Sequence, residues 1–240
     1  MIYLSGVTND VIEPMLLRAG IGLMTSQFIS YSPERVARFR FRAYDNGCFR
    51  SKLIEEDWIN WLSRQPPDPL FAVSPDSYPD AAESLRLGLE YAPILRDMGL
   101  AVGVVAQDQA EQLDWPWEEL DCLFVGGTQL DPPNPRAEWK ESEAAAGLVK
   151  RARNAGKWVH YGRVNDEYRY ALAERNGAHS ADGSMLAFGP DANIKRLIRM
   201  VARRNCAPPL PFERFESPSH DVHKDALVDA ALGDEGGDDG

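Results

Sequence analysis

A short apolar run ends in glycine and polar residues at Lys157-Trp158-Val159-His160-Tyr161-Gly162-Arg163-Val164-Asn165. A second run of the same kind follows one helix later, at Gly177-Ala178-His179-Ser180-Ala181-Asp182-Gly183-Ser184. A buried parallel strand delivers functional groups to the loop at its carboxyl end. Each run therefore predicts a strand with polar residues at its carboxyl end. We expect Asn165 to cap the helix between them and Gly177 to end it. Together the two runs predict a βαβ unit.

The rest of the chain repeats this pattern. Six further strands are expected at residues 2–7, 21–25, 37–43, 70–73, 101–106 and 122–125. Helices are expected at residues 11–18, 53–62, 138–154 and 192–203, and between a cap at Asp80 and a stop at Gly99. This order predicts an α/β fold, a single-domain (β/α)8 TIM barrel with short connections after strands 2 and 5. A doubly wound open sheet would need a phosphate fingerprint, and the sequence has neither GxGxxG nor GxxxxGK followed by Ser or Thr.

The composition fits one globular domain with an acidic tail. At 240 residues and 44% hydrophobic, the chain can bury a full core. The net charge of −11 argues against a broad nucleic-acid surface. However, residues 213–240 hold nine acidic residues against Arg214 and Lys224, so the rest is nearly balanced. We expect residues 1–212 to form the barrel, and residues 213–240, which are rich in Asp and Gly, to be disordered or weakly helical.

We expect no membrane span, disulfide, metal or cofactor. No apolar run is long enough to cross a bilayer, and residues 1–5 are too short and uncharged for a secretion signal, which predicts a cytoplasmic protein. Cys48, Cys122 and Cys206 lie far apart and form no CxxC pair, so buried thiols are the simplest interpretation.

Polar residues gather at the predicted carboxyl ends of six strands. In a barrel they would meet at one mouth: Asp45, Asn46, Asp76, Gln107, Asp108, Gly126, Gly127, His160, Arg163 and Asp182. Carboxylates without a cysteine or multi-histidine set suggest chemistry at an anomeric carbon, where one carboxylate attacks and another protonates the leaving group. The alternative is that these residues are caps and turns, where Asp, Asn and Gly are common.

Six short motifs stand in order at these strand ends. They are Asp45-Asn46-Gly47-Cys48-Phe49, Ser74-Pro75-Asp76, Val105-Ala106-Gln107-Asp108, Phe124-Val125-Gly126-Gly127-Thr128, His160-Tyr161-Gly162-Arg163-Val164-Asn165 and Ser180-Ala181-Asp182-Gly183. Each motif alone is weak, but their order over residues 45–184 resembles the tRNA-guanine transglycosylase superfamily. The resemblance is strongest to its small phage-type branch, which inserts 7-deazaguanines into DNA.

The resemblance implies a role for each motif. Asp182 corresponds to the family's nucleophile, which attacks C1′ of the nucleoside, and Asp45 to its general acid and base. The implied substrate-binding residues are Asn46, Phe49, Asp76, Gln107, Gly126, Gly127, His160, Tyr161, Gly162 and Arg163. Phe49 and Tyr161 would cover the two faces of the base.

Guanine's chemistry agrees with this assignment. Its pairing edge presents N1–H and N2–H2 donors, which suit a carboxylate such as Asp76. Its O6 acceptor suits an amide NH2 or a backbone N–H, and glycines such as Gly126 and Gly127 let the backbone approach closely.

Two features depart from the family pattern. The tRNA enzymes carry a CxC, CxxC and His zinc site in a C-terminal extension, whereas this chain has only Cys206 there, which predicts no zinc and no tRNA-docking subdomain. Asn46 replaces the family's Ser and keeps the polarity. We therefore expect guanine-containing DNA and a free 7-deazaguanine base as substrates. If the protein is phage-encoded, we expect it to act in the host cytoplasm and to protect phage DNA from restriction.

Other polar and aromatic residues have two interpretations. His160 is either a catalyst or a support for one, and Arg163 either binds phosphate or pairs with an acid. Trp115 and Trp117 lie in a loop and could contact nucleic acid, whereas Trp58 and Trp61 are expected in a helix core. Two sets of basic residues could track a phosphate backbone: Arg35, Arg38, Arg50 and Lys52 near the Asp45 loop, and Lys195, Arg196, Arg199, Arg203 and Arg204 on the last helix. The alternative for the second set is a solvated helix face. His220 and His223 in the tail look like a metal pair, but such residues are usually solvated.

The sequence therefore predicts a pentosyltransferase. It would replace guanine in DNA by a preQ0-type 7-deazaguanine through a glycosyl ester on Asp182. Two alternatives remain: a catalytically silent barrel that binds nucleic acid or a protein partner, and a nucleoside or base hydrolase that uses the same pocket. The oligomeric state stays open, a homodimer included.

Overall fold

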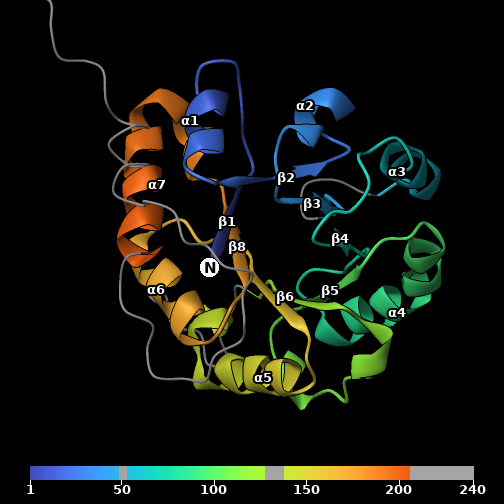
Figure 1. The fold of residues 1–240 in the computed structure, drawn as a ribbon. Helices are drawn as coiled ribbons and strands as arrows, with labels where there is room; N and C mark the ends of the chain where they lie inside the picture. The colour runs from blue at the N-terminus through green and yellow to red at the C-terminus, as the bar shows by residue number, and fades with distance from the viewer. Residues whose placement is uncertain (49–52, 128–137, 206–240) are drawn as a thin grey trace, which may run out of the picture.

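A computed structural model describes residues 1–48, 53–127 and 138–205 and confirms the predicted closed (β/α)8 barrel (Figure 1). The strands pair in parallel and in sequence order, and β1 closes the ring on β8. They are β1 (Ile2–Ser5), β2 (Gly22–Ser26), β3 (Arg42–Asp45), β4 (Ala72–Val73), β5 (Val102–Ala106), β6 (Cys122–Val125), β7 (Trp158–Tyr161) and β8 (Ser180–Gly183).

Helices surround the ring of strands (Figure 1). They are α1 (Glu13–Arg18), α2 (Pro33–Ala37), α3 (Glu55–Leu62), α4 (Ala81–Asp97), α5 (Glu143–Asn154), α6 (Glu167–Arg175) and α7 (Pro190–Asn205), with 3-10 turns η1 (Ala110–Gln112), η2 (Trp117–Glu119), η3 (Trp139–Glu141) and η4 (Met185–Phe188). The connections after β2 and β5 are short, as predicted: the first holds the five-residue α2, and the second holds η1 and η2.

Successive side chains of each strand alternate between the barrel interior and the layer beneath the helices. The interior is filled by Leu4, Met24, Ala43, Phe71, Val73, Val105 and Cys122. Their strand neighbours pack in the outer layer, including Tyr3, Leu23, Tyr44, Ala72, Val104 and Leu123. Only the inward-facing set can reach the mouth along the barrel axis, so this alternation selects the residues that build a site there.

The third strand begins later than predicted. The alternation of Arg and Phe suggested a strand over residues 37–43, but β3 spans Arg42–Asp45. Ser32 caps α2, because its Oγ accepts a hydrogen bond from Arg35 N at 3.3 Å, and Pro33 occupies the first turn. Ala37 therefore ends a helix, and the strand starts only after the following turn.

The cap of α6 also differs from the prediction. Asp166, not Asn165, caps this helix by accepting a hydrogen bond from Arg169 N at 2.8 Å. Asn165 instead joins the β7 and β8 loops: its Oδ1 accepts from Ser184 N at 2.7 Å, and its Nδ2 donates to Ser184 Oγ at 3.2 Å. The amide thus braces the mouth rather than a helix end.

The helix predicted at residues 138–154 is divided in two. The turn η3 comes first, and Ser142 then caps α5 by accepting from Ala145 N at 3.2 Å. The cap at Asp80 is confirmed, because its carboxylate accepts from Glu83 N at 2.9 Å.

Some predictions lie outside the described residues: those for Phe49, Arg50, Lys52, Cys206, His220, His223 and the tail at residues 213–240. In the part of the chain that the structure covers, no helix has the length and apolar character needed to span a membrane.

Candidate active site

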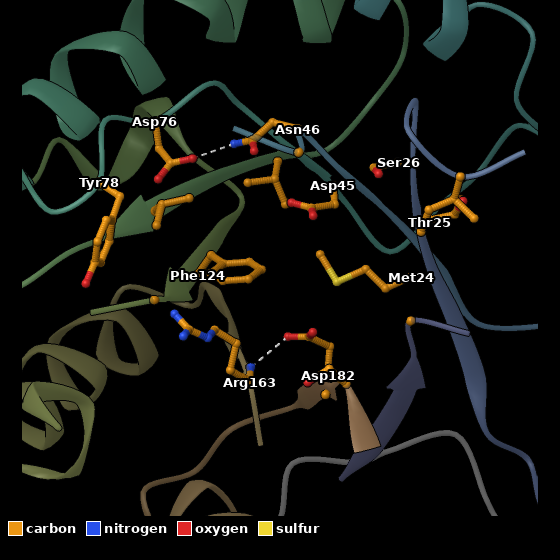
Figure 2. A pocket seen from close by; sticks show the side chains of 18 of the residues that line it. Met24, Thr25, Ser26, Asp45, Asn46, Asp76, Tyr78, Phe124, Arg163 and Asp182 are labelled. Atoms are coloured by element: carbon orange, nitrogen blue, oxygen red, sulfur yellow. Dashed lines mark hydrogen bonds between the residues drawn. The ribbon is translucent and has the colours of Figure 1, made fainter. Parts of the chain in front are cut away.

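A cavity of about 390 Å³ opens at the carboxyl ends of the strands, and all eight strands or their following loops contribute to it (Figure 2). Seven of the predicted site residues line it: Asp45, Asn46, Asp76, Gln107, Gly126, Arg163 and Asp182. The barrel therefore brings together residues that lie up to 137 positions apart in sequence.

Asp45 ends β3 with a raised pKa. Burial of its carboxyl and the negative charges of Asp182 and Asp76 raise this pKa to about 7, against the opposing effect of backbone hydrogen bonds from Gly47 and Asn46. Asp45 can therefore hold a proton near neutral pH and give it to a leaving group. Figure 2 shows Asp45 and Asp182 on opposite sides of the cavity.

Asp182 in β8 is held through one carboxylate oxygen. Its Oδ1 accepts from His160 Nε2 and from Arg163 N, each at 3.1 Å. Arg163 has φ of 61°, a left-handed conformation that is uncommon outside glycine. In Figure 2 the second carboxylate oxygen points away from Arg163, toward the side of Met24.

His160 lies behind Asp182, inside the barrel. Its ring is fully buried, with centroids 5.0 Å from Phe71 and 4.7 Å from Phe124. Its Nδ1 lies 2.8 Å from Ser180 Oγ, which also accepts a hydrogen bond from Trp158 Nε1 at 2.8 Å. This position favours support of Asp182 over direct contact with a substrate.

Asp76 sits in a network of amides at the other side of the cavity. Its Oδ1 accepts from Asn46 Nδ2 at 2.8 Å, and its Oδ2 accepts from Gln107 Nε2 at 2.7 Å. Burial raises the pKa of Asp76, and these two hydrogen bonds work against the shift. The Asn46 amide is itself fixed, because its Nδ2 also donates to Ser74 O at 2.6 Å and its Oδ1 accepts from Cys48 N at 2.8 Å.

Gln107 keeps unused hydrogen-bonding capacity. Its side chain is buried, and within the described residues its Oε1 has no hydrogen-bond partner. Its Nε2 donates to Asp76 and carries a second hydrogen. An unpaired buried acceptor is costly, so a ligand donor in the cavity would relieve this cost.

The backbone N–H groups of Gly126 and Gly127, predicted to bind the base, are hydrogen-bonded within the chain in this structure. Both N–H groups donate to the carbonyl of Ala106, at 3.0 Å and 3.1 Å, because the chain turns tightly at the end of β6. In this structure both N–H groups are therefore occupied by one carbonyl. Gly126 lines the cavity, whereas Gly127 packs closely on Trp139, where an added Cβ would lie 2.5 Å from the ring.

Tyr161 is also misplaced in the prediction. It faces the outer layer, where its hydroxyl accepts from Asn176 Nδ2 of α6 at 2.9 Å, and it does not line the cavity. Among the described residues, the aromatic side chains that line the cavity are Phe124 of β6 and Tyr78, both drawn in Figure 2. Strand alternation could have identified Phe124 from the sequence, since Phe124 pairs with the inward His160.

Lys140 contributes to the site from behind the β7 loop, a role that its sequence position does not predict. It is buried, and its Nζ donates to Gly162 O at 2.9 Å and lies 2.9 Å from Glu138 Oε2. The carbonyl of Gly162 therefore anchors this loop to Lys140. Arg169 completes this cluster by pairing with Glu138 at 2.9 Å. No signal in the sequence distinguishes Lys140 from a solvated helix lysine.

Several predicted nucleic-acid contacts are engaged elsewhere. Arg35 pairs with Asp10 and Glu13, Arg38 pairs with Glu13 at 2.7 Å, and Arg203 pairs with Glu167 at 3.4 Å. Trp115 is buried and stacks on Trp117 with ring centroids 5.5 Å apart. These two tryptophans pack the β5–β6 connection. Trp58 is fully buried on α3, as predicted.

Comparison with known proteins supports the fold. No protein-family model matches the chain, and no curated protein is similar in sequence. Among solved structures, the YdjI aldolase from Escherichia coli K12 is similar with a TM-score of 0.50 and 14% identity, over 85% of this chain and 87% of the aldolase. The Amycolatopsis orientalis BexX/CysO complex is similar with a TM-score of 0.50 and 14% identity, over 88% of this chain and 94% of the matched chain. At these identities the likeness concerns the barrel fold alone.

Proposed function

We propose that this protein is a base-exchange transglycosylase acting on guanine in DNA. Guanine leaves its nucleotide, a glycosyl ester forms on Asp182, and a preQ0-type 7-deazaguanine takes the vacant position. The motif resemblance over residues 45–184 supports this proposal. Geometry adds an argument that does not depend on the resemblance.

The observation that carries the proposal is that the carboxyls of Asp45 and Asp182 line the same cavity. A double displacement at an anomeric carbon needs one carboxylate that attacks and one that is protonated when the leaving group departs. Asp45, with a pKa of about 7, suits the proton donor, and Asp182 suits the nucleophile because His160 Nε2 and Arg163 N hold one of its carboxylate oxygens in place. Because the two carboxyls have different surroundings in one cavity, one can donate the proton while the other attacks.

The amide network supports recognition of guanine's pairing edge. The carboxylate of Asp76 and the unpaired Oε1 of Gln107 are acceptors for the N1–H and N2–H2 donors. Both hydrogens of Asn46 Nδ2 are already donated, and the nearby glycine N–H groups are occupied. The second hydrogen of Gln107 Nε2 is therefore the amide donor for O6.

Arg163 supports a substrate that carries phosphate. Among the described residues that line the cavity, it is the only basic side chain, in a site with three aspartates. Its side chain is exposed, and in Figure 2 it extends away from Asp182, toward the side of Tyr78. A guanidinium placed there can contact a phosphate oxygen next to the target nucleotide, which favours a nucleotide in a polymer over a free nucleoside.

The test is mass spectrometry of nucleosides released from DNA after incubation with the protein and preQ0. We expect 7-deazaguanine nucleosides to appear in the DNA while an equal amount of guanine is released, and neither to occur with Asp182→Asn protein. Duplex DNA, single-stranded DNA and tRNA are compared at matched ionic strength. Guanine release without incorporation would indicate a hydrolase, and no change in any polymer would indicate a catalytically silent barrel.

A further inference from the structure

The hydrogen bonds behind the cavity form a chain that ends on Asp182. We infer that His160 is a positioning residue, which Ser180 and Trp158 hold as the neutral Nε2–H tautomer. In this state it fixes Oδ1 of Asp182, so that Oδ2 is the attacking oxygen. The inference deepens the proposed function and rests on it for the identity of the reaction.

The direction of each hydrogen bond follows from the donors available. The indole of Trp158 can only donate, so Ser180 Oγ accepts from Nε1 at 2.8 Å. Ser180 is fully buried and cannot donate to bulk water. Within the described residues, the only other group in hydrogen-bond range of its Oγ is His160 Nδ1 at 2.8 Å. The hydroxyl hydrogen therefore points to Nδ1, which must be unprotonated to accept it.

An imidazole with an unprotonated Nδ1 is neutral and carries its hydrogen on Nε2. This N–H donates to Asp182 Oδ1 at 3.1 Å, where Arg163 N donates as well. Two neutral donors orient the carboxylate without cancelling its charge, as an imidazolium would. Both use the same oxygen, and this leaves the lone pairs of Oδ2 for bond formation.

The arrangement serves both halves of the exchange. When the Oδ2–C1′ bond forms and the C1′–N9 bond breaks, the departing guanine takes the proton of Asp45, and Oδ1 becomes the carbonyl oxygen of the ester. His160 and Arg163 N can donate to that carbonyl without moving. In the return step, N9 of the incoming base attacks C1′ and gives its proton to Asp45, and the electron pair of the broken ester bond returns to Oδ2.

The tautomer can be tested without substrate. ¹⁵N NMR of histidine-labelled full-length protein, with the His160 signals assigned by their loss in His160→Gln, reports the protonation of each ring nitrogen. We expect a protonated Nε2 and an unprotonated Nδ1 at neutral pH. An imidazolium or an Nδ1–H tautomer would overturn the inference, whatever reaction the protein catalyses.

The positioning role is tested by single-turnover formation of the protein–DNA adduct. Ser180→Ala should slow this step roughly 3- to 10-fold, the effect of one hydrogen bond, with an unchanged KM for the free base. Ser84→Ala is the matched control, because it removes another fully buried serine hydroxyl, which bonds the Ser77 backbone at 3.0 Å. Equal rates in the two variants would overturn the positioning role.

A pair of His160 variants separates hydrogen bonding from packing. His160→Gln keeps an N–H donor near the Nε2 position, whereas His160→Leu fills the space without one. We expect adduct formation in the Gln variant to be roughly 10- to 100-fold faster than in the Leu variant, because a hydrogen bond to a charged group is lost only in Leu. Equal loss in both folded variants would contradict the inference. If the wild-type protein forms no adduct, the proposed reaction fails, and the NMR result alone decides the tautomer.

Discussion

Gln107 Nε2 donates to Asp76 Oδ2 over 2.7 Å, and this hydrogen bond ties the end of β5 to the loop after β4 at the cavity wall. Asp76→Asn places an NH2 group among the amide donors of Gln107 and Asn46, and removes an acceptor for guanine. We expect the KM for the free base to rise roughly 10- to 100-fold, as for loss of a charged hydrogen bond. Exchange assays over a range of base concentrations measure it. Asp97→Asn at the exposed end of α4 is the control, and an unchanged KM in Asp76→Asn would remove Asp76 from base recognition.

The raised pKa of Asp45 predicts the pH dependence of the exchange. A carboxyl with a pKa of about 7 is mostly protonated below pH 7 and mostly ionised above it. Because the departing base needs this proton, the rate of adduct formation should fall as pH rises through about 7. In Asp45→Asn the rate should be roughly 10²- to 10⁴-fold lower and lose this inflection. An inflection that persists in the Asn variant would assign the titration to another group.

Lys140 should stabilise the loop that carries Arg163. Lys140→Met removes its hydrogen bond to Gly162 O and its contact with Glu138, and leaves these buried groups less well paired. We expect the free energy of unfolding in urea to fall by about 1–3 kcal/mol. Lys150→Met, at an exposed position of the same connection on α5, should change it by less than about 0.5 kcal/mol. Equal stability of the two variants would show that the buried cluster contributes nothing.

Arg163 should control the salt dependence of DNA binding. Each phosphate contact releases condensed counterions, so loss of one contact lowers the slope of log K against log salt by about 1. We expect Arg163→Ala to weaken oligonucleotide binding and to reduce the slope by this amount. Arg175→Ala, at the exposed end of α6, is the control. The same slope in wild type and Arg163→Ala would argue against phosphate contact at the rim.

Much of the fold could be predicted because apolar runs with polar ends mark buried parallel strands. The prediction for β6 at residues 122–125 is exact, while the prediction near residue 37 is wrong because Ser32 and Pro33 start a helix within an alternating pattern. Local capping there outweighs periodicity. Asp166 likewise competes successfully with Asn165 for the cap of α6, since Asn165 is used between the two loops.

The site was only partly predictable because strand ends identify positions but not directions. His160 and Tyr161 are neighbours on one strand, so only one can face inward, and the period of two alone excludes their joint use in the cavity. The engagement of Gly126 N–H with Ala106, and the burial of Lys140, depend on loop conformation. Such contacts join separate segments of the chain, and no residue pattern in the sequence predicts them.

The covalent intermediate on Asp182 is the central claim, and peptide mapping of a trapped adduct tests it most directly. Protein is incubated with guanine-containing DNA in the absence of a replacement base, quenched under denaturing conditions, digested with nuclease and protease, and analysed by mass spectrometry. We predict a nucleotide-derived mass on the peptide that contains Asp182, its disappearance in Asp182→Asn, and its loss from wild type when 7-deazaguanine is added before quenching. An adduct on another residue, or normal exchange by the Asp182→Asn protein, would contradict the account.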